Sequence, residues 1–293
     1  MQSLDKIKRR IKTVQTTSKI TGAMKLVATA KIKKQMTEFK TVSDFCQDFY
    51  HIIEDLAKLI SQKTFYQAKK GSSTKKLWII VTSSLGLCGA FNINACKHLM
   101  GLIQPSDQII VIGRKGYSYL RAHGLGDQIT DFMEMSEANF NYLELLPTSE
   151  LIMDLYNQGN FASVHIVYTK FINSITFTPA DVQVLPLNYS LFKADESKST
   201  CSYVALTDDH KEIAYDPSVN NILATCLPIY LTTLMFATIA ESKVCENGAR
   251  RNAMETATDN AKQLIEDLTL QFNRARQENI TQEINEIVAG AGS

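Results

Sequence analysis

The first candidate for a functional site is the segment 83–92. It reads Ser-Ser-Leu-Gly-Leu-Cys-Gly-Ala-Phe-Asn, and it follows an apolar run and precedes an amphipathic stretch. A nucleotide-binding fold places its phosphate loop in this position. However, the segment fits neither G-x-G-x-x-G nor G-x-x-x-x-G-K-[ST], and it lacks the lysine that cradles phosphates. We therefore expect Gly86 and Gly89 to form a tight turn between a strand and a helix.

Cysteine and histidine offer little further chemistry. Cys88 lies where a helix N-terminus would favour a thiolate, but no histidine is near it in the sequence. The six cysteines form no C-x-x-C pair, and the five histidines are dispersed without metal-ligand spacing. We expect reduced thiols in a cytoplasm-like compartment, no zinc site, no catalytic residue and no cofactor.

Strands and helices alternate around this segment, which indicates a parallel sheet covered on both faces. From Lys170 the pattern becomes antiparallel, with a turn or bulge expected at 178–180, and 188–215 is polar and irregular. The expected strands are 77–81, 109–112, 128–133, 164–168, 171–177 and 181–187, and the expected helices are 92–102, 114–123 and 146–157.

The C-terminal stretch predicts one very long helix. Asp216-Pro217-Ser218 is a start signal, and Gly290 is a plausible stop. A helix over 217–289 would be roughly 100 Å long at 1.5 Å per residue. No core of this size covers such a rod, so part of it must pack on something else.

The N-terminal stretch has the same character. Ser3 or Gln2 is expected to open a helix that runs to about residue 62. Steps of three and four residues from Leu4 visit 17 positions, of which 13 are apolar, as in a coiled-coil seam. The four polar positions fall between 18 and 35, where we expect the apolar face to shift to Ile20, Met24 and Val27.

Two long helices with apolar seams most simply pair antiparallel, and dimerisation through either helix is the main alternative. The predicted fold class is α/β, with a long antiparallel coiled coil of the terminal helices and a central Rossmann-like α/β domain. The predicted segments are 1–62, 63–215 and 216–293. The residues expected to pack in the coiled coil are Ile7, Ile11, Val14, Ala253, Ala257, Ala261, Leu264 and Leu268.

Charge is unevenly distributed. Residues 1–40 hold eleven Lys and Arg against two acidic residues, whereas 241–293 hold six basic and nine acidic residues. Nucleic acid is one possible partner for the basic end, but Phe39 is its only aromatic residue, so a stacking platform is lacking. An acidic protein partner explains the same residues. Glu246 and Arg250 are expected to pair on the helix surface. We expect no membrane span and no secretory signal.

Specific motifs at both ends go beyond pattern. Residues 18–28 (Ser-Lys-Ile-Thr-Gly-Ala-Met-Lys-Leu-Val-Ala) resemble the N-terminal helix of the γ subunit of F-type ATP synthases. The C-terminal helix is similar to that family in Ala257-Thr258-Asp259-Asn260-Ala261, in 273–277 (Asn-Arg-Ala-Arg-Gln) and in 280–290. Gly86-Leu87-Cys88-Gly89 with Asn92 is similar to its first strand-turn. The resemblance spans the whole chain.

The resemblance implies a non-catalytic rotor in the central stalk. Its partners would be the α and β subunits of the F1 ring, the ε subunit and the c-ring, and it would couple ATP synthesis or hydrolysis to proton translocation. It would be a peripheral protein on the cytoplasmic face of a bacterial cell membrane. Matching positions imply that Arg276, Gln277 and Thr281 contact a β-subunit loop, with Met24 at the opposing position of the N-terminal helix.

Departures from the family pattern keep other functions open. Ser84 and Leu85 stand where an acidic-basic pair is usual, and Arg251-Asn252 and Glu255 are also atypical. One alternative is the shaft of a specialised F1-like ATPase coupled to other mechanical work. The other is a nucleotide-binding α/β enzyme with a coiled-coil dimerisation arm.

Overall fold

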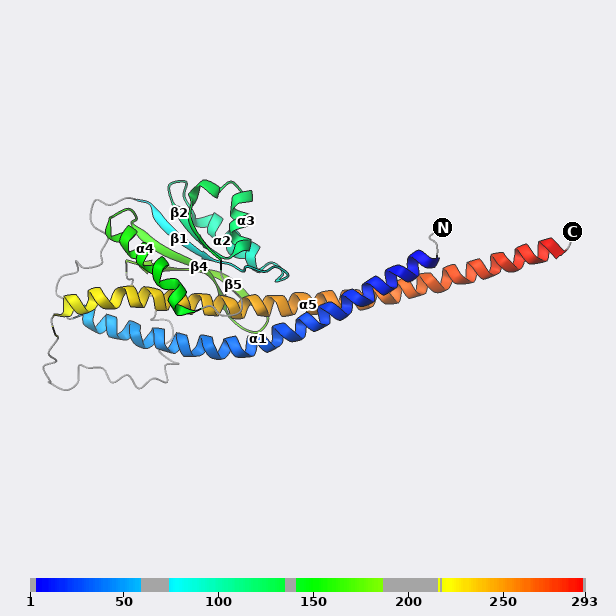
Figure 1. Cartoon of the computed structure of the whole chain (residues 1–293), viewed down its shortest axis with the longest axis horizontal. Helices are drawn as coiled ribbons and strands as arrows, with labels where there is room; N and C mark the ends of the chain where they lie inside the picture. Colours follow the sequence, from blue (N-terminus) through cyan, green and yellow to red (C-terminus); the bar gives the residue numbers. More distant parts are fainter. Residues whose placement is uncertain (1–3, 59–73, 135–140, 187–215, 217, 292–293) are drawn as a thin grey trace. The chain divides into compact units, whose positions relative to one another are not determined.

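A computed structural model describes residues 4–58, 74–134, 141–186, 216 and 218–291 (Figure 1). Its contacts group the chain into two compact units. We call 32–249 the sheet unit, and 1–31 together with 250–293 the paired-helix unit. Two helices run through both units: α1 (Leu4–Lys58) and α5 (Val219–Ala291). Their unbroken length follows from the lack of proline in α1 and a single proline, Pro228, in α5.

The sheet unit is built on one five-stranded sheet in the order β3-β2-β1-β4-β5. The pairs β1–β2, β1–β4 and β2–β3 are parallel, and β4–β5 is antiparallel. The strands are β1 (Lys76–Val81), β2 (Gln108–Ile112), β3 (Ile129–Met133), β4 (Ser163–Phe171) and β5 (Phe177–Leu185). The connections hold α2 (Phe91–Leu102), α3 (Arg114–Ala122), α4 (Leu146–Asn157) and the 3-10 turns η1 (Gly126–Gln128) and η2 (Tyr142–Leu145).

Helices cover both faces of this sheet. Trp78 and Ile80 of β1 pack in the cluster that holds residues of α2 and α3, whereas Leu77 and Ile79 pack with α1, α4 and α5. Successive side chains of a strand point to opposite faces, so a strand buried on both sides reads as a continuous apolar run. This explains the sequence of β1 and confirms the predicted α/β sheet (Figure 1).

Within the sheet unit, α1 and α5 pack side by side and antiparallel. Tyr50 of α1 lies 6.1 Å from Tyr230 between ring centroids, and the Asn247 amide donates to Gln35 Oε1 at 2.9 Å. Later residues of α1 therefore face earlier residues of α5. The Ser218 hydroxyl accepts from the backbone N–H of Asn221 at 3.3 Å and caps α5 two residues after the predicted start.

Three local expectations were wrong. The segment 172–176 is a turn, in which the Asn173 side chain accepts from the N–H groups of Ile175 and Thr176, and it is not part of a strand. Residues 178–180 belong to β5 instead of a turn. Pro179 is tolerated because β5 is an edge strand, where a missing N–H can face outward. Glu246 and Arg250, expected on the helix surface, are buried.

Part of α5 resembles a membrane span in composition. Within 221–287 it contains an 18-residue stretch with a mean hydropathy of 1.9, of which 61% is buried inside the structure. The central helix of a globular fold meets the same criteria. The buried side chains Leu223, Leu227 and Leu231 show that α5 is such a helix in the sheet unit. The opening residues 1–3, the linker around 71–73 and the loop 188–215 lie outside the described residues.

Gly248 permits a close contact between α5 and β5. A Cβ atom added at Gly248 would lie 2.3 Å from Cζ of Phe177. We expect Gly248→Ala to lower the free energy of unfolding by up to about 2 kcal/mol, because an overpacking cost of about 1–3 kcal/mol outweighs a gain of about 1 kcal/mol in helix propensity. Gly22→Ala is the matched control, because nothing lies within 4 Å of its added Cβ. Urea unfolding of the full chain measures both variants, and a stabilised Gly248→Ala would contradict the contact.

His165 predicts a pH effect on stability. Its ring stacks on Trp78 at 4.6 Å and its Nε2 lies 2.9 Å from the Ser163 hydroxyl, while Nδ1 is buried without a partner among the described residues. Burial lowers the pKa of His165, Lys76 lowers it further, and Asp181 and Asp107 oppose the shift. Below about pH 6.5 the unfolded chain therefore binds a proton that the folded chain resists, so stability falls as the pH falls.

His165→Phe keeps an aromatic ring on Trp78 and removes the titrating group. We expect the melting temperature of the variant to fall less between pH 7 and pH 5 than that of the wild-type chain. Identical pH profiles for the two proteins would show that His165 does not carry the effect.

Candidate functional site: the paired helices and the free end of α5

The usual ligand crevice of this fold is filled. In doubly wound sheets, ligands bind in a crevice at the carboxyl ends of the two adjacent strands between which the strand order reverses. In this sheet those two strands are β1 and β4. Cys88 and Phe91 pack there with Cys245 of α5, and Phe171 and Phe177 cover them. Ser83 and Asn92 bond to each other, with Ser83 N to Asn92 Oδ1 at 2.8 Å. Burial raises the pKa of Cys245, which keeps this thiol protonated.

The predicted turn before α2 is confirmed. Leu87 and Gly89 have positive φ angles of 64° and 57°, and the chain enters α2 directly afterwards. Among the described residues, no group of three or more His, Cys, Asp or Glu side chains could hold a metal ion. Residues 82–90 form the turn between β1 and α2.

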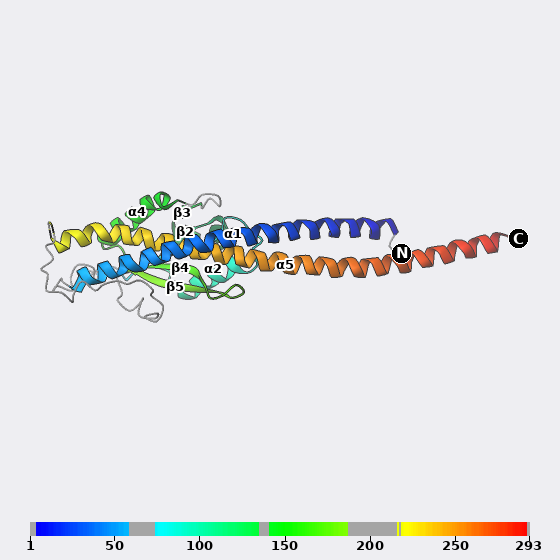
Figure 2. The ribbon, with the colours of Figure 1, turned by 90° about the horizontal axis from the view of Figure 1, so that it is seen from below.

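The paired-helix unit consists of α1 and α5 lying side by side and antiparallel (Figures 1 and 2). Thr21 faces Thr258 with 2.7 Å between the hydroxyl oxygens, and Lys25 Nζ lies 2.7 Å from Glu255 Oε1. The seam between the helices contains small or flexible side chains on both sides. Its most buried members are Ile7, Thr21, Ala28, Met254, Ala261 and Leu268.

The seam does not shift where its polar positions begin, contrary to expectation. Thr21 is 9% exposed and stays in the seam, whereas Ile20 and Val27 are 56% and 57% exposed. An unbroken helix keeps its seam on one face unless it unwinds locally, so the polar Thr21 stays in the seam. The Thr258 hydroxyl gives the Thr21 hydroxyl a hydrogen-bond partner there. Ile20 and Val27, which are seven residues apart, instead lie on one exposed face of α1, and Leu26 is exposed on another side of the helix.

Most basic side chains of the N-terminal segment point outward. The Lys25–Glu255 pair crosses the seam at the surface, where such a pair contributes little to stability. The other basic residues at the start of α1 are exposed: Lys6, Lys8, Arg9, Arg10, Lys12 and Lys19. Their charge is therefore available to a partner.

The end of α5 continues beyond the start of α1 (Figures 1 and 2). From the register at Lys25 and Glu255, Leu4 lies near residue 276, so about 15 residues of α5 run alone, roughly 22 Å at 1.5 Å per residue. Ile280, Ile284 and Ile287 are spaced by four and three residues and are 46%, 54% and 70% exposed. This spacing places them on one face of the helix.

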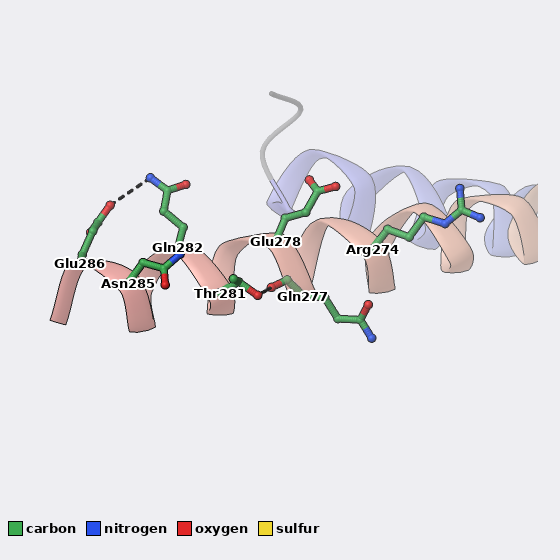
Figure 3. Close-up of a pocket in the computed structure, with 7 residues that line it drawn as sticks. All are labelled: Arg274, Gln277, Glu278, Thr281, Gln282, Asn285 and Glu286. Atoms are coloured by element: carbon green, nitrogen blue, oxygen red, sulfur yellow. Dashed lines mark hydrogen bonds between the residues drawn. The ribbon is translucent and has the colours of Figure 1, made fainter. Parts of the chain in front are cut away.

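Polar side chains lie along the same end of α5. They line an open hollow along a single helix: Arg274, Gln277, Glu278, Thr281, Gln282, Asn285 and Glu286 (Figure 3). The Gln282 amide donates to Glu286 Oε1 at 3.0 Å, and the Thr281 hydroxyl donates to the Gln277 carbonyl at 2.9 Å. The other side chains extend into solvent, so this hollow is an open surface and not a closed binding pocket.

The site residues predicted from the sequence lie at two levels of the helix pair. Arg276, Gln277 and Thr281 are exposed on the free end of α5. Met24 is half-buried next to the Thr21–Thr258 and Lys25–Glu255 contacts, roughly 30 Å from Arg276 along α5 at 1.5 Å per residue. Met24 therefore does not oppose Arg276, and the four residues do not form one cluster.

The predicted packing residues differ in burial. Ile7, Ala261 and Leu268 are buried in the paired-helix unit, and Ile11, Val14, Ala253 and Ala257 are half-buried. Leu264 is 38% exposed at the edge of the seam, while its neighbour Ile265 is half-buried.

Sequence reasoning missed the apolar face of Ile280, Ile284 and Ile287. The signal was present, because their spacing continues the helical pattern past the point that Leu4 can reach. The outward position of Ile20, Leu26 and Val27 was missed for a different reason: the pattern alone did not show which of two faces α5 would cover.

The structure combines two long helices paired around a seam, a free helical end and an α/β domain whose crevice is filled. Comparisons agree. The family model described as ATP synthase matches residues 3–293. The chain is 39% identical over 292 residues to the ATP synthase gamma chain of Malacoplasma penetrans and 37% identical over 289 residues to that of Ureaplasma parvum, with 99% of each chain covered.

Solved structures share the fold. A chain of the Euglena gracilis mitochondrial ATP synthase matches with a TM-score of 0.67 at 16% identity, covering 98% of this chain and 92% of that one. A chain of the Tetrahymena thermophila central stalk and c-ring matches with a TM-score of 0.59 at 19% identity, covering 81% and 99%. The chain belongs to the gamma-chain family of ATP synthases, the central-stalk rotor subunits, which are not catalytic.

The Thr21–Thr258 contact generates a prediction about the seam. Thr21→Val or Thr258→Val alone leaves one hydroxyl against a methyl group and is expected to cost about 1 kcal/mol of unfolding free energy. The double variant replaces both hydroxyls, so its cost should be less than that of the two single variants added together. Urea unfolding of all four proteins measures the coupling, and strictly additive costs would contradict the contact.

Proposed function

We propose that this chain transmits torque between the catalytic β subunits of an F1 ring and a membrane rotor, and so couples ATP synthesis or hydrolysis to proton translocation. Its partners would be the α and β subunits around the paired helices, and the ε subunit and c-ring against the α/β domain. An asymmetric shaft contacts each catalytic subunit differently, so its rotation biases each subunit between open and closed states.

The observation that carries this proposal is the free end of α5. A single helix with exposed Ile280, Ile284 and Ile287 would leave an apolar face in water. A ring of subunits around the helices would cover that face together with the exposed side chains of Ile20, Leu26 and Val27 on α1. The exposed basic side chains at the start of α1 favour acidic surfaces in the same ring.

The three predicted segments then have distinct roles. Residues 1–62 and 216–293 would supply the shaft, and 63–215 the α/β domain that meets the ε subunit and the c-ring. The proposed location is the cytoplasmic face of a bacterial cell membrane, with the chain as a peripheral protein. The bacterial gamma chains that it resembles support this location.

The proposed contacts with the β subunits lie on the shaft. Arg276, Gln277 and Thr281 are exposed around the free end of α5, where a surrounding loop could bind them. Met24 would contact the ring at a second level, farther from the C-terminal end of the paired helices. Ile7, Ile11, Val14, Ala253, Ala257, Ala261, Leu264 and Leu268 are proposed to hold the two helices together.

Purification of the complex tests the function. A tag on this chain should recover two larger subunits with phosphate-binding loops, each in threefold excess over it, together with ATPase activity. A chain that binds and hydrolyses ATP alone would favour the enzyme alternative. Recovery of the ring without a c-ring would favour the specialised F1-like ATPase that drives other mechanical work.

Arg276→Ala and Gln277→Ala are expected to lower ATP turnover or coupling in the assembled complex by roughly threefold to tenfold, as for a lost polar contact worth about 1 kcal/mol. The isolated chain should stay folded, because both side chains are exposed. Gln263→Ala, an exposed glutamine on the same helix, is the control. Turnover and torque equal to those of the wild type in both variants would remove these residues from the proposed contact.

A further inference from the structure

The strand β4 extends beyond its neighbour β1. The two strands pair in parallel as far as Ile80 and Val167, and β4 then continues to Phe171 with β5 on its other side. Thr169 and Phe171 lie opposite Pro179 and Phe177 of β5. Paired residues of antiparallel strands alternate between hydrogen-bonded and non-bonded positions, and Pro179 has no N–H to offer. The N–H groups of Thr169 and Phe171 therefore point to the side that β1 has left.

Two consecutive residues of α5 take the place of the missing strand. The Thr169 N–H donates to the Ser242 hydroxyl at 3.1 Å, and the Phe171 N–H donates to Glu241 Oε1 at 2.9 Å. Ser242 and Thr169 are 2% and 3% exposed, so water does not substitute for this bond. Burial raises the pKa of Glu241, while the bond from Phe171 and the charge of Lys170 lower it. An oxygen of Glu241 can accept this bond in either protonation state.

These bonds differ in kind from the packing around them. The apolar contacts of α5 with the sheet are non-directional, and side chains in such contacts can repack after a small rotation. Two hydrogen bonds from alternate residues of a strand to adjacent residues of a helix fix both the rotation of the helix about its axis and its position along that axis relative to the strand. A buried N–H that loses its acceptor also keeps its full desolvation cost.

We propose that Glu241 and Ser242 are positioning residues that hold the α/β domain in one rotational setting on α5, so that torque in the helix reaches the domain without slip. The inference rests on the proposed function, because it assigns the contact through which α5 would pass torque to the α/β domain. Every group involved lies within the sheet unit.

The test uses the assembled membrane complex with its full-length chain. The double variant Glu241→Ala, Ser242→Ala removes both acceptors, Glu241→Gln keeps a carbonyl acceptor, and Asp154→Ala removes an exposed carboxylate from α4 of the same unit. Three quantities are measured: the ATP hydrolysis rate, the protons pumped per ATP, and the hydrogen exchange of the peptide that contains Thr169 and Phe171.

We expect the double variant to hydrolyse ATP at the wild-type rate but to pump about fivefold fewer protons per ATP, as for the loss of two backbone hydrogen bonds that set a conformational equilibrium. The exchange of the Thr169 and Phe171 amides should rise. Glu241→Gln, which retains Ser242, and Asp154→Ala should match the wild type in pumping.

Unchanged pumping per ATP in the double variant overturns the inference, and so does a parallel loss of hydrolysis and pumping, which would indicate a purely structural role. If the double variant does not assemble, Ser242→Ala alone is used, and it must show both the reduced coupling and the faster exchange at Thr169. Failure of the proposed function is distinguishable, because the wild-type complex would then hydrolyse ATP without pumping.

Discussion

The structure depends on one constraint: α5 is longer than anything in its own chain can cover. Its 73 residues meet the sheet and α1 over one part and α1 alone over another, and the last part meets nothing that the structure describes. Apolar side chains continue along all three parts. A single helix of this length is stable because tertiary contacts cover its apolar face, so the uncovered part implies partners.

The composition of the seam changes with what surrounds it. In the sheet unit, α5 is buried on all sides from Leu231 to Ala240, with Phe236 the one half-buried residue, and carries large apolar residues there. In the paired-helix unit its buried residues alternate with exposed ones, and Ala261 and Thr258 keep the helices close. Polar seam pairs such as Thr21–Thr258 and Gln35–Asn247 favour one alignment of the helices, because a shifted register would break these contacts between them.

Much of the fold follows from the sequence, because the spacing of apolar residues and the residues that begin or end an element are local properties. The elements β1, β2 and α4 were predicted to within a few residues from their apolar spacing and helix signals. The start of α5 was also predicted to within a few residues, because few prolines interrupt that end of the chain. The hairpin β4–β5 was mispredicted because Asn173 competes for backbone N–H groups through its side chain, and because Pro179 is acceptable only on an edge strand. Neither fact is visible before the sheet order is known. The same limit applies to the site: the sequence marks Arg276, but only the register of α1 and α5 separates it from Met24.

We propose that the paired helices turn inside a ring of catalytic subunits and that the α/β domain turns with them. The most direct measurement attaches a visible probe to the exposed Arg121 position of α3, through Arg121→Cys, in a surface-held ring complex supplied with ATP. We expect stepwise rotation of the probe in one direction, at a rate set by ATP turnover. A probe that stays still or only fluctuates while the same complexes hydrolyse ATP would contradict it.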